Sequence, residues 1–391
     1  MPKPTHEVTR TIRSEQVLNA FIQVVRSNLP LDLQNTRITA EDILYVLAYA
    51  DVHRLSIAST CQELQDAPSG NRLREVLVEA LPDRAGVQCA LNRIFHQQLH
   101  PSLLKGKRAY NIAIDLTLIP YHGQPYQDKK EIVRGAPKSG TTHFHGYATV
   151  SIVHDNRRFV VALRFVEYSE EMADIVRWLI KRVKSLKIRL RRVFLDKGFC
   201  SKPVFKVLNQ HKLSYVVPIP VRGKSGGVRS LFQGKSRKTS YTFHSPKYGA
   251  YTVHAVVTKR YSKGRYGRHS SKWFAYAVTG LPAGITPAQV FELYRQRFGI
   301  ESSYRQMNQV RARTSTRNPV IRLLLIGLAF VIFNLYITLR QSLSSALKRP
   351  LKSPKRFWLS MRRLALMLAR AIERLWGIED VLQLQPFVTL S

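Results

Sequence analysis

The chain has 391 residues, 45% of them hydrophobic, so it can bury the cores of two or three domains. Its 62 lysine and arginine residues outnumber the 25 aspartate and glutamate residues, which gives a formal net charge of +37. This excess predicts a polyanionic partner such as DNA, RNA or an anionic membrane surface. The alternative is a basic surface that is only solvated. The 3 cysteines are far apart and form no CxxC motif, which argues against a disulfide framework and a zinc site.

Residues 1–105 are predicted to form a helical domain. The stretch TAEDILYVLAYADVHR begins with Thr39 as a helix cap, followed by an acidic first turn and an apolar stripe. Two shorter helical stretches follow, one on each side of the breaker sequence DAPSG. Three short helices with small residues in their turns resemble a helix-turn-helix, in which Arg72 and Arg74 would contact DNA. An ordinary helical bundle is the alternative.

From residue 108 the hydrophobic pattern changes to that of strands. The expected order is a strand at 108–121, two strands in 142–167, a helix at 172–186, a strand at 191–196, a helix at 202–212 and a strand at 213–220. This order, β-β-β-α-β-α-β, predicts an α/β fold with a ribonuclease H-like mixed sheet. In that arrangement the fourth strand lies parallel beside the first. We assign residues 106–220 and 281–345 to this domain.

Residues 221–280 are predicted to be a β-rich insertion in the α/β domain. Runs with β propensity alternate there with Gly, Ser and Lys turns, and aromatic residues are interleaved with basic ones. This composition suits phosphate contact combined with base stacking. Trp273, on the last strand of the insertion, is the candidate for stacking on a displaced base, and an ordinary buried strand is the alternative.

The chain is predicted to return to helices after Pro287. The run LLLIGLAFVIFNLYITL, between Arg322 and Arg340, is at the short limit of a membrane-spanning helix. We interpret it as a helix buried in a large core and expect no membrane partner. Residues 346–391 are predicted to be a C-terminal helical segment.

Three acidic residues occupy notable places in this basic chain. Asp115 ends the apolar part of the first strand and Asp196 ends the fourth, so parallel neighbours would hold both carboxylates at one edge of the sheet. Adjacent carboxylates are costly unless a cation lies between them. Two unrelated aspartates, each capping a turn, are the alternative. Glu301 could complete a triad or could pair with Arg297 and Arg305.

A triad on strand, strand and helix would suit two-metal phosphoryl transfer, because three carboxylates can hold two ions about 3.5–4 Å apart. Hard oxygen ligands favour Mg²⁺ or Mn²⁺ over zinc. His143 and His145 share a strand face, but imidazole is a poor ligand for Mg²⁺, so packing or DNA contact is expected. Lys197, directly after Asp196, could contact a phosphate or neutralise local charge.

Taken together, these motifs resemble those of the insertion-sequence DDE transposases. One large group of that family carries the signature Tyr-(2)-Arg-(3)-Glu-(6)-Lys around its last acid. Tyr294, Arg297 and Glu301 have this spacing, whereas Asn308 stands in place of the lysine. The segments IDLTLIPYHG and FLDKGF are similar to the settings of the family's first two acids. The block GTTHFHGYATVSI is most similar to the halobacterial-type branch, and the resemblance covers residues 108–340.

The resemblance implies a DNA transposase that binds the terminal inverted repeats of its own element. It would cleave and join DNA strands with Mg²⁺ or Mn²⁺, held by the catalytic residues Asp115, Asp196 and Glu301. The candidate DNA contacts are Tyr294, Arg297, Arg305, Asn308, Lys197, Trp273, Arg72 and Arg74. The expected partners are the terminal repeats, target DNA and a second copy forming a homodimer on DNA.

The same resemblance implies a cytoplasmic, nucleoid-associated protein of a prokaryote. Two other functions stay open at this point. One is a catalytically silent DNA-binding protein derived from a transposase, and the other is a ribonuclease H-like nuclease without strand transfer.

Overall fold

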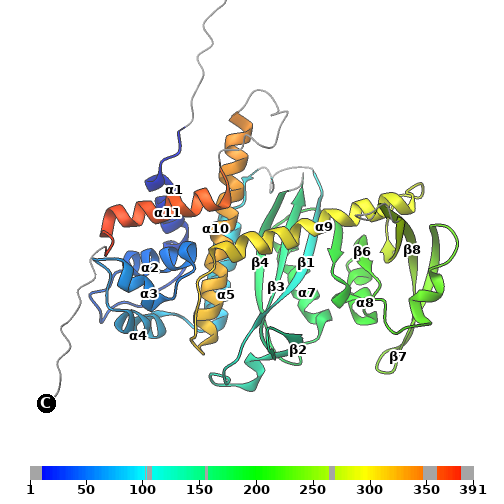
Figure 1. Cartoon of the computed structure of the whole chain (residues 1–391), viewed down its shortest axis with the longest axis horizontal. Coiled ribbons are helices and arrows are strands. Elements are labelled where there is room, and N and C mark those ends of the chain that lie inside the picture. Colours follow the sequence, from blue (N-terminus) through cyan, green and yellow to red (C-terminus); the bar gives the residue numbers. More distant parts are fainter. Residues whose placement is uncertain are drawn as a thin grey trace, which may run out of the picture. The chain divides into compact units, whose positions relative to one another are not determined.

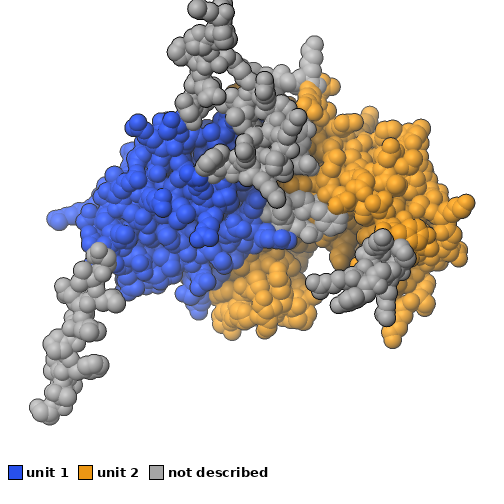
Figure 2. Space-filling view, turned by 45° about the horizontal axis from the view of Figure 1, so that its top comes forward, with its two compact units in different colours: residues 1–98, 305–391 blue, residues 99–304 orange. Residues whose placement is uncertain are grey.

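The computed structural model describes residues 11–101, 103, 108–154, 157–263, 269–346 and 359–379. The side chains at 154, 157, 262–263, 269–270, 298–303 and 344–346 are outside this description. The chain divides into two compact units, shown in different colours in Figure 2. Unit 1 contains residues 1–98 and 305–391, and unit 2 contains residues 99–304.

The described residues of unit 2 form a nine-stranded mixed sheet (Figure 1). Its strands are β1 (Tyr110–Pro120), β2 (Val133–Lys138), β3 (Thr141–His154), β4 (Arg157–Val166), β5 (Leu190–Leu195), β6 (Tyr215–Pro218), β7 (Arg237–Ser245), β8 (Gly249–Lys263) and β9 (His269–Thr279). Their order across the sheet is β2-β3-β1-β5-β6-β9-β8-β7, and β4 also pairs with β3.

This order confirms the predicted ribonuclease H-like arrangement, because β5, the fourth predicted strand, pairs in parallel with β1. Two details differ from the sequence-based expectation. Strand β2 lies where a basic loop was expected and pairs antiparallel with β3. The inserted strands continue the main sheet, because β9 pairs antiparallel with β6. The insertion therefore shares its backbone hydrogen bonds with the strand that follows β5.

The α-helices described in unit 2 are α7 (Met172–Ser185), α8 (Lys202–Gln210) and most of α9 (Pro287–Met307). Helix α7 buries one apolar stripe that includes Ile175, Leu179 and Val183. These residues have the spacing of an amphipathic helix. At the start of α9, Thr286 and Gln289 exchange side-chain-to-backbone hydrogen bonds of 3.2 and 2.8 Å. This reciprocal cap, with Pro287 as the first helical residue, fixes where α9 begins.

Unit 1 is helical in its described residues. Its helices are α1 (Ser14–Arg26), α2 (Ala40–His53), α3 (Ile57–Glu63), α4 (Gly70–Ala80), α5 (Arg84–Gln97), α10 (Pro319–Ala346) and α11 (Met361–Trp376). The predicted cap at Thr39 is present, since its side chain accepts a hydrogen bond from the Asp42 backbone N–H at 3.2 Å. Helix α4 begins against α3, where a Cβ added to Gly70 would lie 2.8 Å from the Cα of Ala58.

The long apolar run forms α10. Within the described residues it is the one helix whose length and composition would allow it to cross a membrane, and 78% of that span is buried. A Cβ added to Gly327 of this helix would lie 2.3 Å from a methyl carbon of Leu91 in α5. Close packing of this kind is expected of a helix in a protein core, in agreement with our interpretation of the apolar run.

Candidate active site

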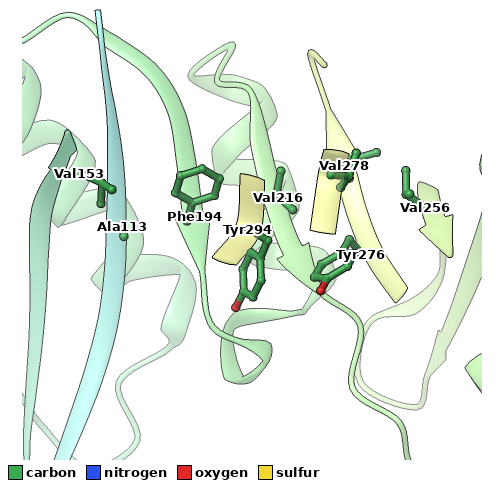
Figure 3. Packing of buried hydrophobic residues seen from close by; sticks show 9 residues of the cluster. Ala113, Val153, Phe194, Val216, Val256, Tyr276, Val278 and Tyr294 are labelled. Carbon is green, nitrogen blue, oxygen red and sulfur yellow. The ribbon is translucent and has the colours of Figure 1, made fainter. Parts of the chain in front are cut away.

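The register of β1 and β5 places two of the three predicted acids together. Ala113 pairs with Phe194 and Ile114 pairs with Leu195, so Asp115 and Asp196 follow at the same level on neighbouring strands. Side chains alternate between the faces of a strand, so each aspartate shares the face of the residue two positions earlier. Ala113 and Phe194 belong to a buried cluster with Tyr294 of α9 (Figure 3). Both carboxylates therefore lie on the side of the sheet that faces α9.

Helix α9 presents one stripe of residues to this face of the sheet. Val290, Tyr294, Arg297 and Tyr304 are spaced by four, three and seven residues, which is the repeat of one helical face. Val290 and Tyr294 pack in the same buried cluster. Position 301 lies on the stripe between Arg297 and Tyr304, and the side chain of Glu301 is outside the described part of the structure.

The two aspartates share the guanidinium group of Arg297. Its Nη2 lies 3.2 Å from Oδ1 of Asp196, and its Nη1 lies 3.7 Å from Oδ1 of Asp115. Only 5% of the Arg297 side chain is exposed, compared with 16% for Asp115 and 38% for Asp196. Burial opposes the charge of Arg297, but Tyr294 and the two carboxylates outweigh it, so the pKa of Arg297 is raised. A cation thus lies against both acids.

Tyr294 fixes α9 to the end of β5. Its hydroxyl donates a 3.1 Å hydrogen bond to the carbonyl oxygen of Leu195, the residue before Asp196. Its ring centroid lies 5.4 Å from Cζ of Arg297, within the range of a cation–π contact. Burial raises the pKa of Tyr294, so the phenol stays neutral and available as a donor. Although Tyr294 was predicted to contact DNA, it is 2% exposed and supports the second acid from inside.

Tyr304 makes a corresponding connection beside the first acid, and the sequence analysis missed it. Its hydroxyl is hydrogen-bonded to the hydroxyl of Thr149, which is the cross-strand partner of Asp115. Burial, reinforced by the charge of Asp115, raises the pKa of Tyr304, while Thr117 and Thr149 hydrogen-bond its hydroxyl. The signal in the sequence is its place three residues after Glu301 on the same helical stripe. Two tyrosines therefore hold α9 on both sides of position 301.

A second buried arginine lies close to this group. Arg158 of β4 donates a hydrogen bond from Nη2 to the carbonyl oxygen of Gln296 in α9. Burial, together with the charge of Arg297, lowers the pKa of Arg158 to about 10. Sequence reasoning did not find Arg158, because nothing local distinguishes it from the many other arginines. Arg297, which contacts the acid pair, thus has a second buried cation in its surroundings.

The remaining predicted DNA contacts are mostly exposed. Lys197 starts the 3₁₀ turn η2 (Lys197–Phe199), and Asn308 starts the 3₁₀ turn η4 (Asn308–Val310); both are exposed, as is Arg305. Arg72 and Arg74 are exposed on α4, where Nη1 of Arg72 lies 3.4 Å from the carboxylate of Glu75. These side chains are accessible to a phosphate backbone.

Trp273 is half-buried on β9. Its ring stacks on Phe232 with centroids 5.9 Å apart and an interplanar angle of 8°, and Nζ of Lys259 lies 5.4 Å from its centroid. Of the two histidines considered, His145 is buried beside the ring of Tyr121, at a centroid distance of 4.6 Å, as expected of a packing role. His143 lies within 3.1 Å of Arg134.

The described side chains include no group of three His, Cys, Asp or Glu residues that could hold a metal ion. Asp115 and Asp196 supply two of the three predicted ligands, and the third belongs to Glu301. Their oxygen donors, in the middle of β1 and directly after β5, fit a hard divalent ion such as Mg²⁺ or Mn²⁺. The chemistry of the donor set therefore agrees with the expected metal.

Comparisons with known proteins agree with this geometry. No curated protein matches the chain in sequence. Among solved structures, a piggyBac transposase synaptic complex with hairpin DNA is similar, with a TM-score of 0.56 and 15% identity. The match covers 97% of this chain and 85% of the other, and at this identity it shows a common fold. A family model described as "Transposase DDE domain" matches residues 107–335, more than half of the chain and a range that contains all three acids. The chain therefore belongs to the transposase DDE domain family.

Proposed function

We propose that this transposase binds the terminal inverted repeats of its own insertion sequence and catalyses metal-dependent strand cleavage and strand transfer. Asp115, Asp196 and Glu301 are its catalytic, metal-binding residues. The observation that carries the proposal is the parallel register of β1 and β5, which brings two acids within reach of one guanidinium from the helix that carries Glu301. The similarity of the block GTTHFHGYATVSI and the run RFGIESSYRQMNQVRART supports assignment to the halobacterial-type branch.

When bound, the divalent ions would activate the attacking water or 3′-hydroxyl and stabilise the leaving oxygen. The chain's own residues position the ligands for that chemistry. The Oδ1 atom of Asp115 accepts a 3.1 Å hydrogen bond from the backbone N–H of Leu116, which limits rotation of this carboxylate. Tyr294 holds the end of β5 before Asp196, and Tyr304 holds the strand opposite Asp115. Ligands fixed in this way need little reorganisation when the metal binds.

DNA binding is proposed for exposed basic and amide side chains. The net charge of +37 favours a polyanion at any sequence. Lys197 follows the second acid directly, is exposed, and is proposed to contact a phosphate near the cleaved bond. Arg305, Asn308, Arg72 and Arg74 are proposed to position further DNA, and a homodimer would hold two element ends. Trp273 is proposed to stack on a displaced base, with Phe232 supporting the ring.

The proposal is tested by cleavage of a duplex that carries the terminal inverted repeat, once sequencing of the DNA that flanks the gene has identified that repeat. Asp115→Asn, Asp196→Asn and Glu301→Gln should each abolish Mg²⁺-dependent cleavage and leave DNA binding intact. Exposed acids provide matched controls: Asp174→Asn for the aspartates, and Glu292→Gln on α9 for Glu301. Normal cleavage by Glu301→Gln would overturn the triad. Cleavage by the native protein without joined products would instead identify a nuclease that lacks strand transfer.

A further inference from the structure

We propose that Arg297 is a displaceable counter-cation that makes metal binding at the acid pair depend on the DNA phosphate. This inference rests on the proposed function, since it assumes that Asp115 and Asp196 bind divalent metal. It concerns the cation that contacts Asp115 and Asp196 before DNA binds. The starting observation is that the guanidinium contacts Oδ1 of both carboxylates from a side chain that is 5% exposed.

The guanidinium and a divalent ion would compete for the same acid pair. Like charges a few ångströms apart repel each other, and more strongly beside a buried side chain than in bulk water. Arg158, which influences Arg297 electrostatically, adds a second buried positive charge on this side of the sheet. A metal ion can therefore bind well only when Arg297 moves its charge away from Asp115 and Asp196. Until then the guanidinium of Arg297 neutralises the negative charge of both carboxylates.

The substrate offers Arg297 an alternative anionic partner to the two carboxylates. A guanidinium binds a phosphate through two parallel hydrogen bonds, and DNA brings phosphates to the same edge that carries the acids. The hydrogen bond from Tyr294 to Leu195 holds α9 beside β5, so the backbone of Arg297 stays anchored while its guanidinium, which also contacts the Tyr294 ring, changes partner. The two binding events then favour each other, and this coupling must be the same in both directions.

Mn²⁺ binding to the full-length protein without DNA tests the competition directly by titration calorimetry. Arg297→Gln should bind Mn²⁺ about 5–150-fold more tightly than the native protein, the usual range of coupling between sites. Arg295→Gln is the matched control, because it removes the same charge from the same helix at an exposed position. It should bind Mn²⁺ as the native protein does.

Arg297→Lys keeps the charge but not the two-pronged contact, so it should bind Mn²⁺ with an intermediate affinity. This variant decides the question if Arg297→Gln does not fold. Mn²⁺ affinities for Arg297→Gln and Arg297→Lys no tighter than that of the native protein would overturn the counter-cation role. Failure of the proposed function looks different: the native protein would then show no Mn²⁺ binding that Asp115→Asn and Asp196→Asn remove.

The coupling to DNA has its own measurement. A short duplex carrying the terminal repeat should raise the Mn²⁺ affinity of the native protein, measured by electron paramagnetic resonance after subtracting Mn²⁺ bound by the duplex alone. The increase should be largely absent in Arg297→Gln, whose acid pair is already released. An equal increase in both proteins would show that the DNA supplies the metal ligands itself, which would contradict the role of Arg297.

Discussion

Each unit of this protein contains carboxylates in a costly environment, and their surroundings differ. In unit 1, Asp51 of α2 is fully buried, and its Oδ1 accepts a 2.8 Å hydrogen bond from the backbone N–H of Ala312. In unit 2, Asp115 and Asp196 are partly exposed, lie on adjacent strands and share Arg297. The single acid fastens one segment of chain to another. The Asp115–Asp196 pair is accessible to solvent, brings two carboxylates together and contacts the cation of Arg297.

This difference teaches that burial of an acid does not by itself mark a catalytic site. Burial raises the pKa of Asp51 well above its usual value, although the Ala312 N–H and the charge of Arg311 oppose this effect. Such a shift is often taken to indicate function. Here the clustering of two carboxylates on neighbouring strands, and not the size of a pKa shift, distinguishes the candidate active site.

The sharpest contrast is expected in catalysis. Asp115→Asn should lower the rate of Mg²⁺-dependent cleavage by at least about a thousandfold, because losing a metal ligand removes several kcal/mol of transition-state stabilisation. Asp51→Asn should cleave at nearly the native rate. Single-turnover cleavage of the terminal-repeat duplex measures both. Equal losses of cleavage rate in the two variants would show that Asp51 and Asp115 do not differ in catalytic role.

The reverse contrast is expected in stability. Asp51→Ala leaves the Ala312 N–H without its acceptor and should lower the free energy of unfolding by about 1–3 kcal/mol. Asp115→Asn keeps the shape of the side chain and should change stability much less. Denaturant unfolding measures the free energy of unfolding of both variants. A larger loss of this free energy in Asp115→Asn than in Asp51→Ala would contradict the structural role of Asp51.

Asp51 should also make stability depend on pH. Its pKa is raised on folding, so the folded state holds this proton more tightly than the unfolded chain does. The contribution is complete below the ordinary carboxyl pKa and is lost as the pH rises through the folded value. Asp51→Asn keeps an acceptor for Ala312 but cannot ionise. The stability of this variant relative to the native protein should therefore grow with pH, and a constant difference would disagree.

Tyr304 tests whether the first acid is supported from α9. Tyr304→Phe removes only the hydroxyl and should lower stability by about 1 kcal/mol. If the hydroxyl positions α9 beside Asp115, the Mg²⁺ concentration for half-maximal cleavage should also rise severalfold. Tyr276→Phe, in the same unit, is the control and should leave the Mg²⁺ requirement unchanged. An unaltered requirement in Tyr304→Phe would leave the hydroxyl with a packing role alone.

The smallest effect is expected on DNA binding by unit 1. Arg72→Gln and Arg74→Gln should each reduce the slope of log affinity against log salt by about 1, the amount for one phosphate contact. Arg93→Gln, which replaces an exposed arginine of α5, is the comparison variant for the salt dependence. Fluorescence anisotropy with the terminal-repeat duplex over a range of salt measures the slopes. Slopes equal to that of the native protein would remove α4 from the DNA interface.

Much of this arrangement could be predicted because it depends on patterns that are local in the sequence. Asp115 lies within one apolar strand and Asp196 follows another, and the ribonuclease H-like order predicted that these strands are parallel neighbours. The cap at Thr39 and the helix beginning at Pro287 are also short-range signals. Strand β2 was missed because Val133–Lys138 has the composition of a loop and becomes a strand only through pairing with β3.

The partners of the acids could not be predicted in the same way. Arg297 was expected to face a phosphate, yet its long side chain reaches two strands that are distant in sequence. Arg158 and Tyr304 become relevant only after the sheet folds and α9 lies across it. The inserted strands show the same limit, because alternation predicted them but not their attachment to β6.

The central claim is that Asp115, Asp196 and Glu301 surround one metal centre, and cleavage of the protein itself can locate that centre. Fe²⁺ bound in place of Mg²⁺, with ascorbate and peroxide, produces hydroxyl radicals that cut the backbone beside the ion. We predict fragments ending near residues 115, 196 and 301, which excess Mg²⁺ and Asp196→Asn should suppress. Fragments from other segments, or the same three cuts in Asp196→Asn, would contradict the account.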